Sequence, residues 1–141
     1  MSELTFDNVS LGLMQIFAEE TGVQAKDCIV AEGKVVFLVM PGEVRKVVGA
    51  HGERIDTLKS RLKREIQVVE FSKETQKLIM NVFYPFSPEK VVFEPRGKGR
   101  HATVTVAEGW KARAIGKAGR NLKIARALIS RHSDVISVNV A

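Results

Sequence analysis

The chain has 141 residues and a net charge of +6, with 45% hydrophobic and 27% charged residues, which indicates a globular protein and excludes a disordered tail. No apolar run approaches the roughly 18 to 20 residues that span a bilayer, and the N-terminus lacks the pattern of a signal peptide. We therefore expect a cytoplasmic protein with no membrane partner, and the single cysteine, Cys28, excludes an internal disulfide framework.

The first half of the chain predicts six elements in the order helix, strand, strand, helix, helix, strand. Helical spacing of apolar residues, β-branched runs, and glycine or proline turns mark these elements. The expected elements are a helix capped by Asp7 or Asn8, with Val9, Leu13, Ile16 and Phe17 inward and Gly22 at its end; strands at 28–31 and 34–40 joined at Glu32-Gly33; a short helix from Glu43; a helix with Ile55, Leu58 and Leu62 inward; and a strand at 66–71.

The second half predicts the same order of elements. These are a helix capped by Ser72, with Leu78, Ile79, Val82 and Phe83 inward and Pro85 and Pro88 closing it; strands at 90–94 and 101–107 around an open basic turn at 96–100; a short helix after Gly109; a helix with Leu122, Ala125 and Ile129 inward; and a strand at 134–140. The basic turn is either a solvated hairpin tip or an auxiliary phosphate contact.

One fixed offset of 67 residues aligns the two halves without a gap, which indicates an internal repeat. The matched pairs are Gly42 with Gly109, Lys46 with Arg113, Val48 with Ile115, Gly49 with Gly116, Gly52 with Gly119, Lys59 with Arg126, and Val68 with Val135. The sequence therefore predicts two domains, at 1–72 and 73–141.

Each repeat contains a Gly-x-x-Gly turn between two predicted helices, Gly49-Ala50-His51-Gly52 in the first and Gly116-Lys117-Ala118-Gly119 in the second. Glycine has no Cβ and accepts positive φ, so such a turn lets the backbone approach another molecule closely. The helix that follows presents N–H groups and the positive end of its dipole to an anion. Both turns are therefore candidate anion contacts.

The positive charge belongs to the second half of the chain. Residues 1–72 contain 9 Lys and Arg against 11 Asp and Glu, whereas residues 73–141 contain 13 against 5. This excess favours a polyanionic partner for the second half, but solvated lysines explain it equally well.

A hairpin, two helices joined by Gly-x-x-Gly, and a closing strand resemble the KH domain, a module that binds single-stranded nucleic acid. Because the extra helix and strand precede the turn, the resemblance is to the type II order. Two adjacent modules, the second turn within 114–122 and the junction at 68–72 are similar to the KH pair of the NusA transcription factor family, in its short archaeal form. The fold class expected is α+β, with two tandem type II KH domains, each α-β-β-α-α-β with a three-stranded mixed sheet and helices packed on one face.

In KH domains this loop clamps the sugar-phosphate backbone of about four nucleotides while the bases lie over an apolar groove. The resemblance therefore implies single-stranded RNA as the partner. The expected RNA-binding residues are Gly116, Lys117, Ala118, Gly119, Arg120, Lys123, Arg126 and Arg113 around the second turn, and Gly49, Ala50, His51, Gly52, Arg54 and Lys46 around the first. The second turn is the stronger candidate, because it carries Lys117 and because cations recur at every third residue along the helix that follows.

The first turn departs from this pattern. Ala50 and His51 give it no full positive charge at neutral pH, and Glu53 follows at the helix start, where it would repel a phosphate. A turn kept for packing or weaker contact and a turn that binds RNA remain alternatives. Nearby Arg45 and Arg54 favour some contact.

No other residues form a convincing reactive site. Cys28 is interpreted as a buried small hydrophobe, and Trp110 either packs in the core or stacks on a base or a partner. The three histidines lie far apart in the chain, so no metal site is expected. Without a nucleophile-base pair or a phosphate loop for nucleotides, we expect no enzyme activity, cofactor or small-molecule substrate.

By resemblance to NusA, the expected role is in transcription elongation or termination, with RNA polymerase as a further partner. Two alternatives remain open. One is a ribosome or rRNA-processing factor, since KH modules also serve there. The other is a protein-docking adaptor whose acidic first module holds the polymerase.

Overall fold

The computed structural model describes residues 8–31 and 33–141. The predicted cap Asp7 and the hairpin residue Glu32 lie outside them. The chain divides into two compact units, with the boundary between Ser72 and Lys73, which we call the first and second modules. In the described part of the chain, no helix is both long enough and apolar enough to cross a membrane.

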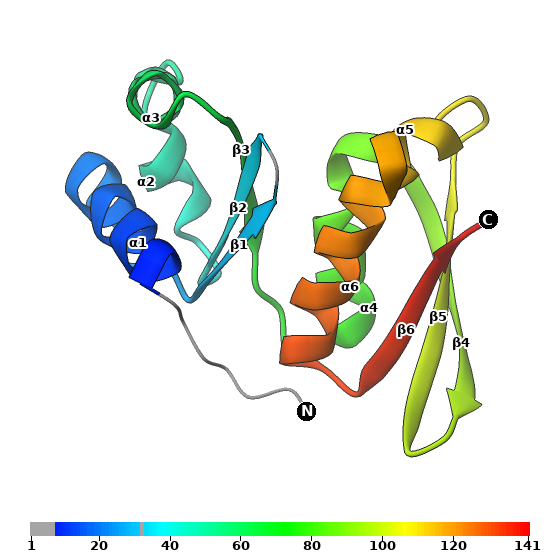
Figure 1. Ribbon diagram of the computed structural model, residues 1–141. Helices are drawn as coiled ribbons and strands as arrows, with labels where there is room; N and C mark the ends of the chain where they lie inside the picture. The colour runs from blue at the N-terminus through cyan, green and yellow to red at the C-terminus, as the bar shows by residue number, and fades with distance from the viewer. Residues whose placement is uncertain (1–7, 32) are drawn as a thin grey trace. The chain divides into compact units, whose positions relative to one another are not determined.

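The first module packs three helices on one face of a three-stranded sheet (Figure 1). Strand β2 lies at the centre, antiparallel to β1 and parallel to β3. The elements are α1 (Asn8–Thr21), β1 (Asp27–Ala31), β2 (Lys34–Val39), α2 (Val44–Val48), α3 (Glu53–Leu62) and β3 (Glu65–Glu70).

The core of the first module lies between its helices and sheet. Alternation along β2 directs Val35, Phe37 and Val39 to one face, where Phe37 stacks on Phe17 of α1 with ring centroids 4.2 Å apart. Cys28 is buried in the same cluster, which confirms its interpretation as a small core residue. The helical face predicted for α3 is also confirmed, because Leu58 is fully buried and Ile55 and Leu62 pack beside it.

Helix α1 differs from its prediction at one position. Val9 is 55% exposed, so the buried face begins only at Leu13. The predicted end of the helix is confirmed, because Gly22 has φ 73° and its N–H donates to the carbonyl of Ala18 at 2.9 Å.

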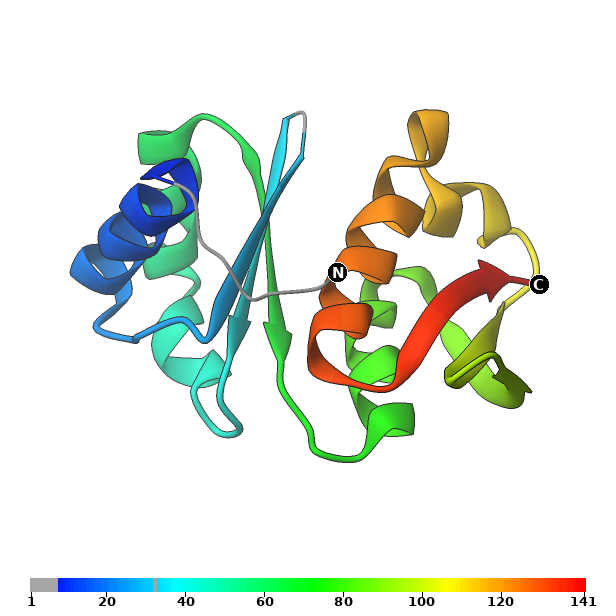
Figure 2. The ribbon, with the colours of Figure 1, turned by 60° about the horizontal axis from the view of Figure 1, so that its bottom comes forward.

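The second module has the same architecture, with the helices again on one face of the sheet (Figure 2). Strand β5 is central, antiparallel to β4 and parallel to β6. The elements are α4 (Thr75–Val82), the 3-10 turn η1 (Tyr84–Phe86), β4 (Pro88–Arg96), β5 (Gly99–Val106), α5 (Lys111–Ile115), the 3-10 turn η2 (Lys117–Gly119), α6 (Arg120–His132) and β6 (Val135–Val140). Both modules therefore have the α+β order expected of type II KH domains.

The second core confirms the predicted inward residues, but the structure corrects two predicted element ends. The residues predicted to face inward from α4 and α6 are all buried: Leu78, Ile79, Val82, Phe83, Leu122, Ala125 and Ile129. Helix α4 begins after Glu74 rather than at a Ser72 cap, so that prediction is wrong. Pro88 does not close the helix but begins β4, a position where proline loses no sheet hydrogen bond.

The repeat is strict through the Gly-x-x-Gly region and is lost after it. Helices α2 and α5 occupy equivalent positions at the offset of 67, and α3 and α6 begin at the equivalent residues Glu53 and Arg120. Helix α6 then has 13 residues where α3 has 10. Val135 consequently begins β6 whereas Val68 lies inside β3, so this matched pair does not mark equivalent positions.

Candidate nucleic-acid interface

The two Gly-x-x-Gly segments form loops, here called the first loop (residues 49–52) and the second loop (residues 116–119), whose glycines have nearly the same backbone angles. Gly49 has φ 84° and ψ 176°, and Gly116 has φ 80° and ψ 167°, a region that only glycine adopts readily. Gly52 and Gly119 are left-handed, with φ 76° and 75°. The repeat found in the sequence is therefore also a repeat of glycine conformation. The loops differ between the glycines, where Ala118 has φ 55° but the equivalent His51 does not have positive φ.

Close packing also requires the first glycine of the second loop, whereas at Gly49 the nearest atoms belong to the end of the flexible, exposed Glu53 side chain. A Cβ on Gly49 would lie 2.5 Å from the Glu53 carboxylate, and a Cβ on Gly116 would lie 2.9 Å from the backbone nitrogen of Asn121. The second glycines have space, because the nearest atom is 4.0 Å away at Gly52 and 3.9 Å away at Gly119. Positive φ therefore accounts for all four glycines, and close packing against backbone adds a second requirement at Gly116 alone of the four.

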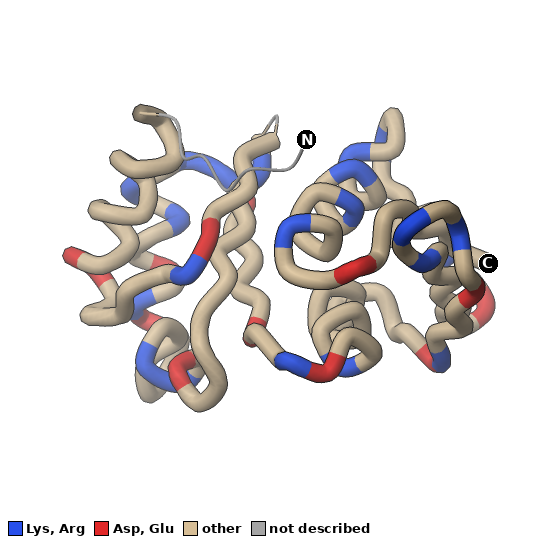
Figure 3. Tube along the Cα trace, turned by 90° about the horizontal axis from the view of Figure 1, so that it is seen from below, with Lys and Arg blue, Asp and Glu red and all other residues tan. Residues whose placement is uncertain are grey.

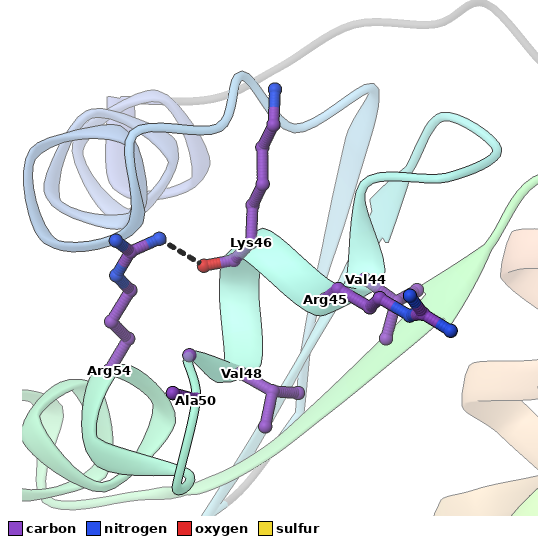
Figure 4. A pocket seen from close by; sticks show the side chains of 7 residues that line it. Val44, Arg45, Lys46, Val48, Ala50 and Arg54 are labelled. Carbon is purple, nitrogen blue, oxygen red and sulfur yellow. Dashed lines mark hydrogen bonds between the residues drawn. The ribbon is translucent and has the colours of Figure 1, made fainter.

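Each loop is braced by a side chain from the helix that follows it. In the first module, Nη1 of Arg54 donates to the carbonyl of Lys46 at 2.7 Å (Figure 4). In the second, Nδ2 of Asn121 donates to the carbonyl of Arg113 at 2.8 Å. These are equivalent positions in the repeat. Arg54, expected only as an RNA contact, therefore also stabilises its own loop, and Asn121 has the same role without having been predicted.

The loops also differ at the first residue of the following helix. Glu53 turns back over the first loop, where the backbone N–H of Ala50 donates to its Oε1 at 3.1 Å and that of His51 donates to its Oε2 at 2.7 Å. Residue 120, at the equivalent place in the second module, is Arg. The first loop therefore already has a carboxylate on its N–H groups, and the second has a cation at that position.

The cations predicted around the second loop lie in different surroundings. Lys117 and Lys123 are exposed. Arg120 is half-buried, and Nε of Arg126 donates to the carbonyl of Val138 in β6 at 3.0 Å. Figure 3 shows Lys and Arg segments outnumbering acidic ones in the second module, in agreement with the sequence.

The exposed Arg113 lies over the ring of the half-buried Trp110, with its guanidinium carbon 4.9 Å from the ring centroid. This cation-π contact places a planar cation beside an aromatic ring at the start of α5.

A surface pocket of about 620 Å³ adjoins the first loop, between α2 and the start of α3 (Figure 4). It combines apolar side chains with three cations. Its lining residues are Val44, Arg45, Lys46, Val48, Gly49, Ala50 and Arg54. Val44 and Val48 were not predicted as site residues. In the sequence, the spacing of four residues between Val44 and Val48 places both on one side of a short helix, and this was the signal that could have predicted an apolar surface there.

The basic hairpin is closed rather than open, so the predicted five-residue turn is wrong. Strands β4 and β5 pair up to Arg96 and Gly99, which leaves only Gly97 and Lys98 between them. Arg100 binds the carboxylate of Asp134 through two nitrogens, at 2.9 Å and 2.8 Å. Two of the three cations expected in the turn, Arg96 and Arg100, therefore lie in strands. Both form ion pairs within the module, because Arg96 also lies 3.4 Å from the carboxylate of Glu94.

Two carboxyl groups in these regions should titrate at unusually low pH. Backbone N–H donors, those of Glu53 itself and His51 first, hold the pKa of the Glu53 carboxyl below its usual value. Hydrogen bonds from Arg100 do the same for the pKa of Asp134. Since both are lowered in the folded chain, each carboxylate contributes stability that is present above the unfolded pKa, about 4, and lost as pH falls through the folded pKa.

We therefore expect the chemical shifts of both side-chain carboxyl carbons to titrate below the usual range in an NMR pH series. A Glu53 carboxyl that titrates at or above the usual glutamate pKa, about 4.3, would contradict the hydrogen bonding described for the first loop.

The histidines do not come together. His51 is exposed in the first loop, whereas His101 is buried with Nδ1 2.6 Å from Oγ of Ser137. Within residues 8–31 and 33–141, no three His, Cys, Asp or Glu side chains are grouped as metal ligands would be.

Comparison with known proteins gives consistent matches. A family model described as the NusA-like second KH domain matches residues 75–141. A protein of Halobacterium salinarum named probable transcription termination protein NusA is 30% identical over 128 residues, which cover 91% of this chain and 91% of that protein. The protein of the same name from Thermoplasma acidophilum is 24% identical, covering 99% of this chain and 97% of that protein.

A solved crystal structure, that of APE1850, is also similar. It is 32% identical in sequence, with a TM-score of 0.76, and the match covers 96% of this chain and 100% of that chain. The fold and the order of both modules are thus shared with a known structure.

Proposed function

This chain belongs to the NusA-like family of proteins with tandem KH domains, and we propose that it binds single-stranded RNA and acts in transcription elongation or termination. The relatives of similar length are named transcription termination proteins, which supports the role in transcription. The single observation that carries RNA binding is the second loop. It combines two glycines at positive φ, an exposed lysine and the start of a 13-residue helix.

The second loop has the features that a phosphate contact requires. Gly116 and Gly119 remove side-chain bulk, and Lys117 adds charge without being buried. Arg113 and Lys123 are exposed on the helices before and after the loop, so they can follow the backbone of an extended strand. The proposed contacts of this module are Arg113, Gly116, Lys117, Ala118, Gly119, Arg120, Lys123 and Arg126.

The first module contributes a different kind of contact. Its pocket offers apolar surface from Val48 and Ala50 beside the cations Arg45 and Lys46, which suits a base with its flanking phosphate. The proposed contacts here are Lys46, Gly49, Ala50, His51, Gly52 and Arg54. We place the stronger backbone contact in the second module, because the N–H groups of Ala50 and His51 already have a carboxylate partner.

Equilibrium binding to fluorescent single-stranded RNA at several salt concentrations tests this proposal. The logarithm of the association constant should fall linearly with the logarithm of salt, with a slope of roughly −0.7 for each phosphate neutralised. A duplex RNA of the same composition should bind more weakly, because its bases are not available for stacking. Affinity that does not change with salt, or equal affinity for the duplex, would contradict the proposal.

Capture of partners from a cell extract tests the role in transcription. We expect the full chain to retain RNA polymerase subunits, with part of the signal lost after nuclease treatment because nascent RNA links the two. Retention of ribosomal particles in place of polymerase would support the alternative role in rRNA processing. Polymerase retained in full after nuclease treatment would support a protein-docking adaptor.

A further inference from the structure

We propose that Glu53 closes the first loop to phosphate, so that the chain binds an RNA backbone through the amides of one loop rather than two. The statement about RNA rests on the function proposed above. The statement about phosphate concerns only the chemistry of residues 49–53. Glu53 is in this sense a specificity-determining residue, because it occupies amides of the first loop that would otherwise be open to an anion.

The geometry is that of an occupied anion site. Both carboxylate oxygens of Glu53 accept backbone hydrogen bonds, at 3.1 Å from Ala50 and 2.7 Å from His51. A phosphate presents the same pair of anionic oxygens to such N–H groups. The carboxylate is attached to the chain, so it is always present at the loop, and a phosphate must displace it before it can use the same donors.

The second loop resembles the first at its glycines and its brace but has no such carboxylate, and it differs at Ala118, which is left-handed where His51 is not. The φ values of its glycines agree with those of the first loop within 4°, as 80° and 75° against 84° and 76°. The brace from Asn121 to the carbonyl of Arg113 matches the brace from Arg54 to that of Lys46. The acid at position 53 and the arginine at position 120 are thus the charge difference at the start of the two following helices.

The charge of Glu53 adds to the effect of its hydrogen bonds. A phosphate that approached Ala50 and His51 would lie beside an exposed carboxylate, whose repulsion acts in the same direction as the occupied donors. Loss of charge-assisted hydrogen bonds commonly changes affinity by about 10-fold or more. We therefore expect removal of the carboxylate to strengthen anion binding at this loop by roughly 10-fold.

Amide NMR of the full chain with inorganic phosphate as the probe tests the inference directly. Phosphate added to Glu53→Ala should shift the amide signals of Ala50 and His51 at concentrations about 10-fold lower than in the original chain. Glu53→Gln, which keeps the shape of the side chain without its charge, should lie between the two. Asp56→Asn is the matched control, because it removes the same charge from the same first helical turn without a contact to these amides, and it should behave as the original chain.

Two results would overturn the inference. One is that Glu53→Ala and the original chain bind phosphate at the first loop equally. The other is that Asp56→Asn gains as much as Glu53→Ala, since general charge would then explain the effect.

An RNA arm separates this inference from the proposed function. Glu53→Ala should bind single-stranded RNA more tightly than the original chain, with a salt slope more negative by roughly 0.7 for one additional phosphate. If no variant binds RNA but phosphate still distinguishes Glu53→Ala from the control, the proposed function fails and the inference about Glu53 stands. If the original chain binds RNA and Glu53→Ala changes neither the affinity for RNA nor the salt slope, the extension of the inference from phosphate to RNA is wrong.

Discussion

Replacement of Lys117 and Ala118 with aspartate is expected to weaken binding of single-stranded RNA by about 100-fold while the second module stays folded. The change removes one exposed cation and places two carboxylates where a phosphate is proposed to lie. A hydrogen bond to a charged group contributes about 1.5 to 3 kcal/mol, so loss of one such contact together with new repulsion reaches this size.

The fold should tolerate this double variant. Lys117 is exposed, and Ala118 already has a left-handed backbone with φ 55° and ψ 24°. Aspartate accepts that conformation at least as well as alanine, because its short polar side chain forms local hydrogen bonds. Circular dichroism and thermal unfolding should therefore match those of the original chain, and the loss can be assigned to binding.

The first loop supplies the matched control. Replacement of Ala50 and His51 with aspartate adds the same two carboxylates at the equivalent positions, but beside Glu53. That loop is proposed to be closed to phosphate already. The affinity of this double variant for RNA should therefore fall by less than about 5-fold, which corresponds to about 1 kcal/mol. Equal losses from the two double variants, measured by fluorescence anisotropy, would contradict the dominance of the second loop.

Gly116→Ala is expected to destabilise the second module by about 3 kcal/mol, whereas Gly119→Ala should cost only about 1 kcal/mol. Both positions have positive φ. Only Gly116 combines this with a Cβ position 2.9 Å from the backbone of Asn121, where neither group can move easily. At Gly119 the nearest atom is the end of a flexible lysine at 3.9 Å, so strain in φ is the main cost.

Urea unfolding of the two variants, each followed by circular dichroism, measures this difference. Equal destabilisation would show that backbone conformation alone sets the requirement for glycine. The expected difference also has a practical consequence. Gly116 is a poor position for testing RNA contact, because a loss of binding there would include damage to the loop, whereas Lys117 and Ala118 avoid this problem.

Much of the fold could be predicted because it depends on local patterns. The alternation of β-branched residues, the helical spacing of Leu58 with its neighbours and the glycines at turns each act within a few residues, and the structure confirms the elements they predict. The element ends in the second module were less accurate. Glu74 rather than Ser72 precedes α4, and Pro88 begins a strand. These boundaries depend on strand pairing and on packing against neighbouring elements, which a local pattern does not contain.

The extent of the β4–β5 hairpin shows the same limit. The glycines at 97 and 99 suggest an open turn, yet Arg100 is held in β5 by the carboxylate of Asp134, a residue 34 positions away. No local pattern contains that partner. The length of α6 is a similar case, since three additional residues shift β6 relative to β3 and end the repeat that the sequence shows so clearly upstream.

By itself, the sequence determined that this protein is a tandem repeat with two Gly-x-x-Gly loops and with its positive charge in the second half, because composition, periodicity and a fixed offset are properties of the chain as written. Only the tertiary structure decided what Glu53 does. The sequence allowed it to be a residue favoured by the helix dipole or one that repels phosphate. The folded loop directs both its oxygens to the N–H groups of Ala50 and His51. That outcome depends on the three-dimensional path of the backbone, which brings the side chain over the loop that precedes it.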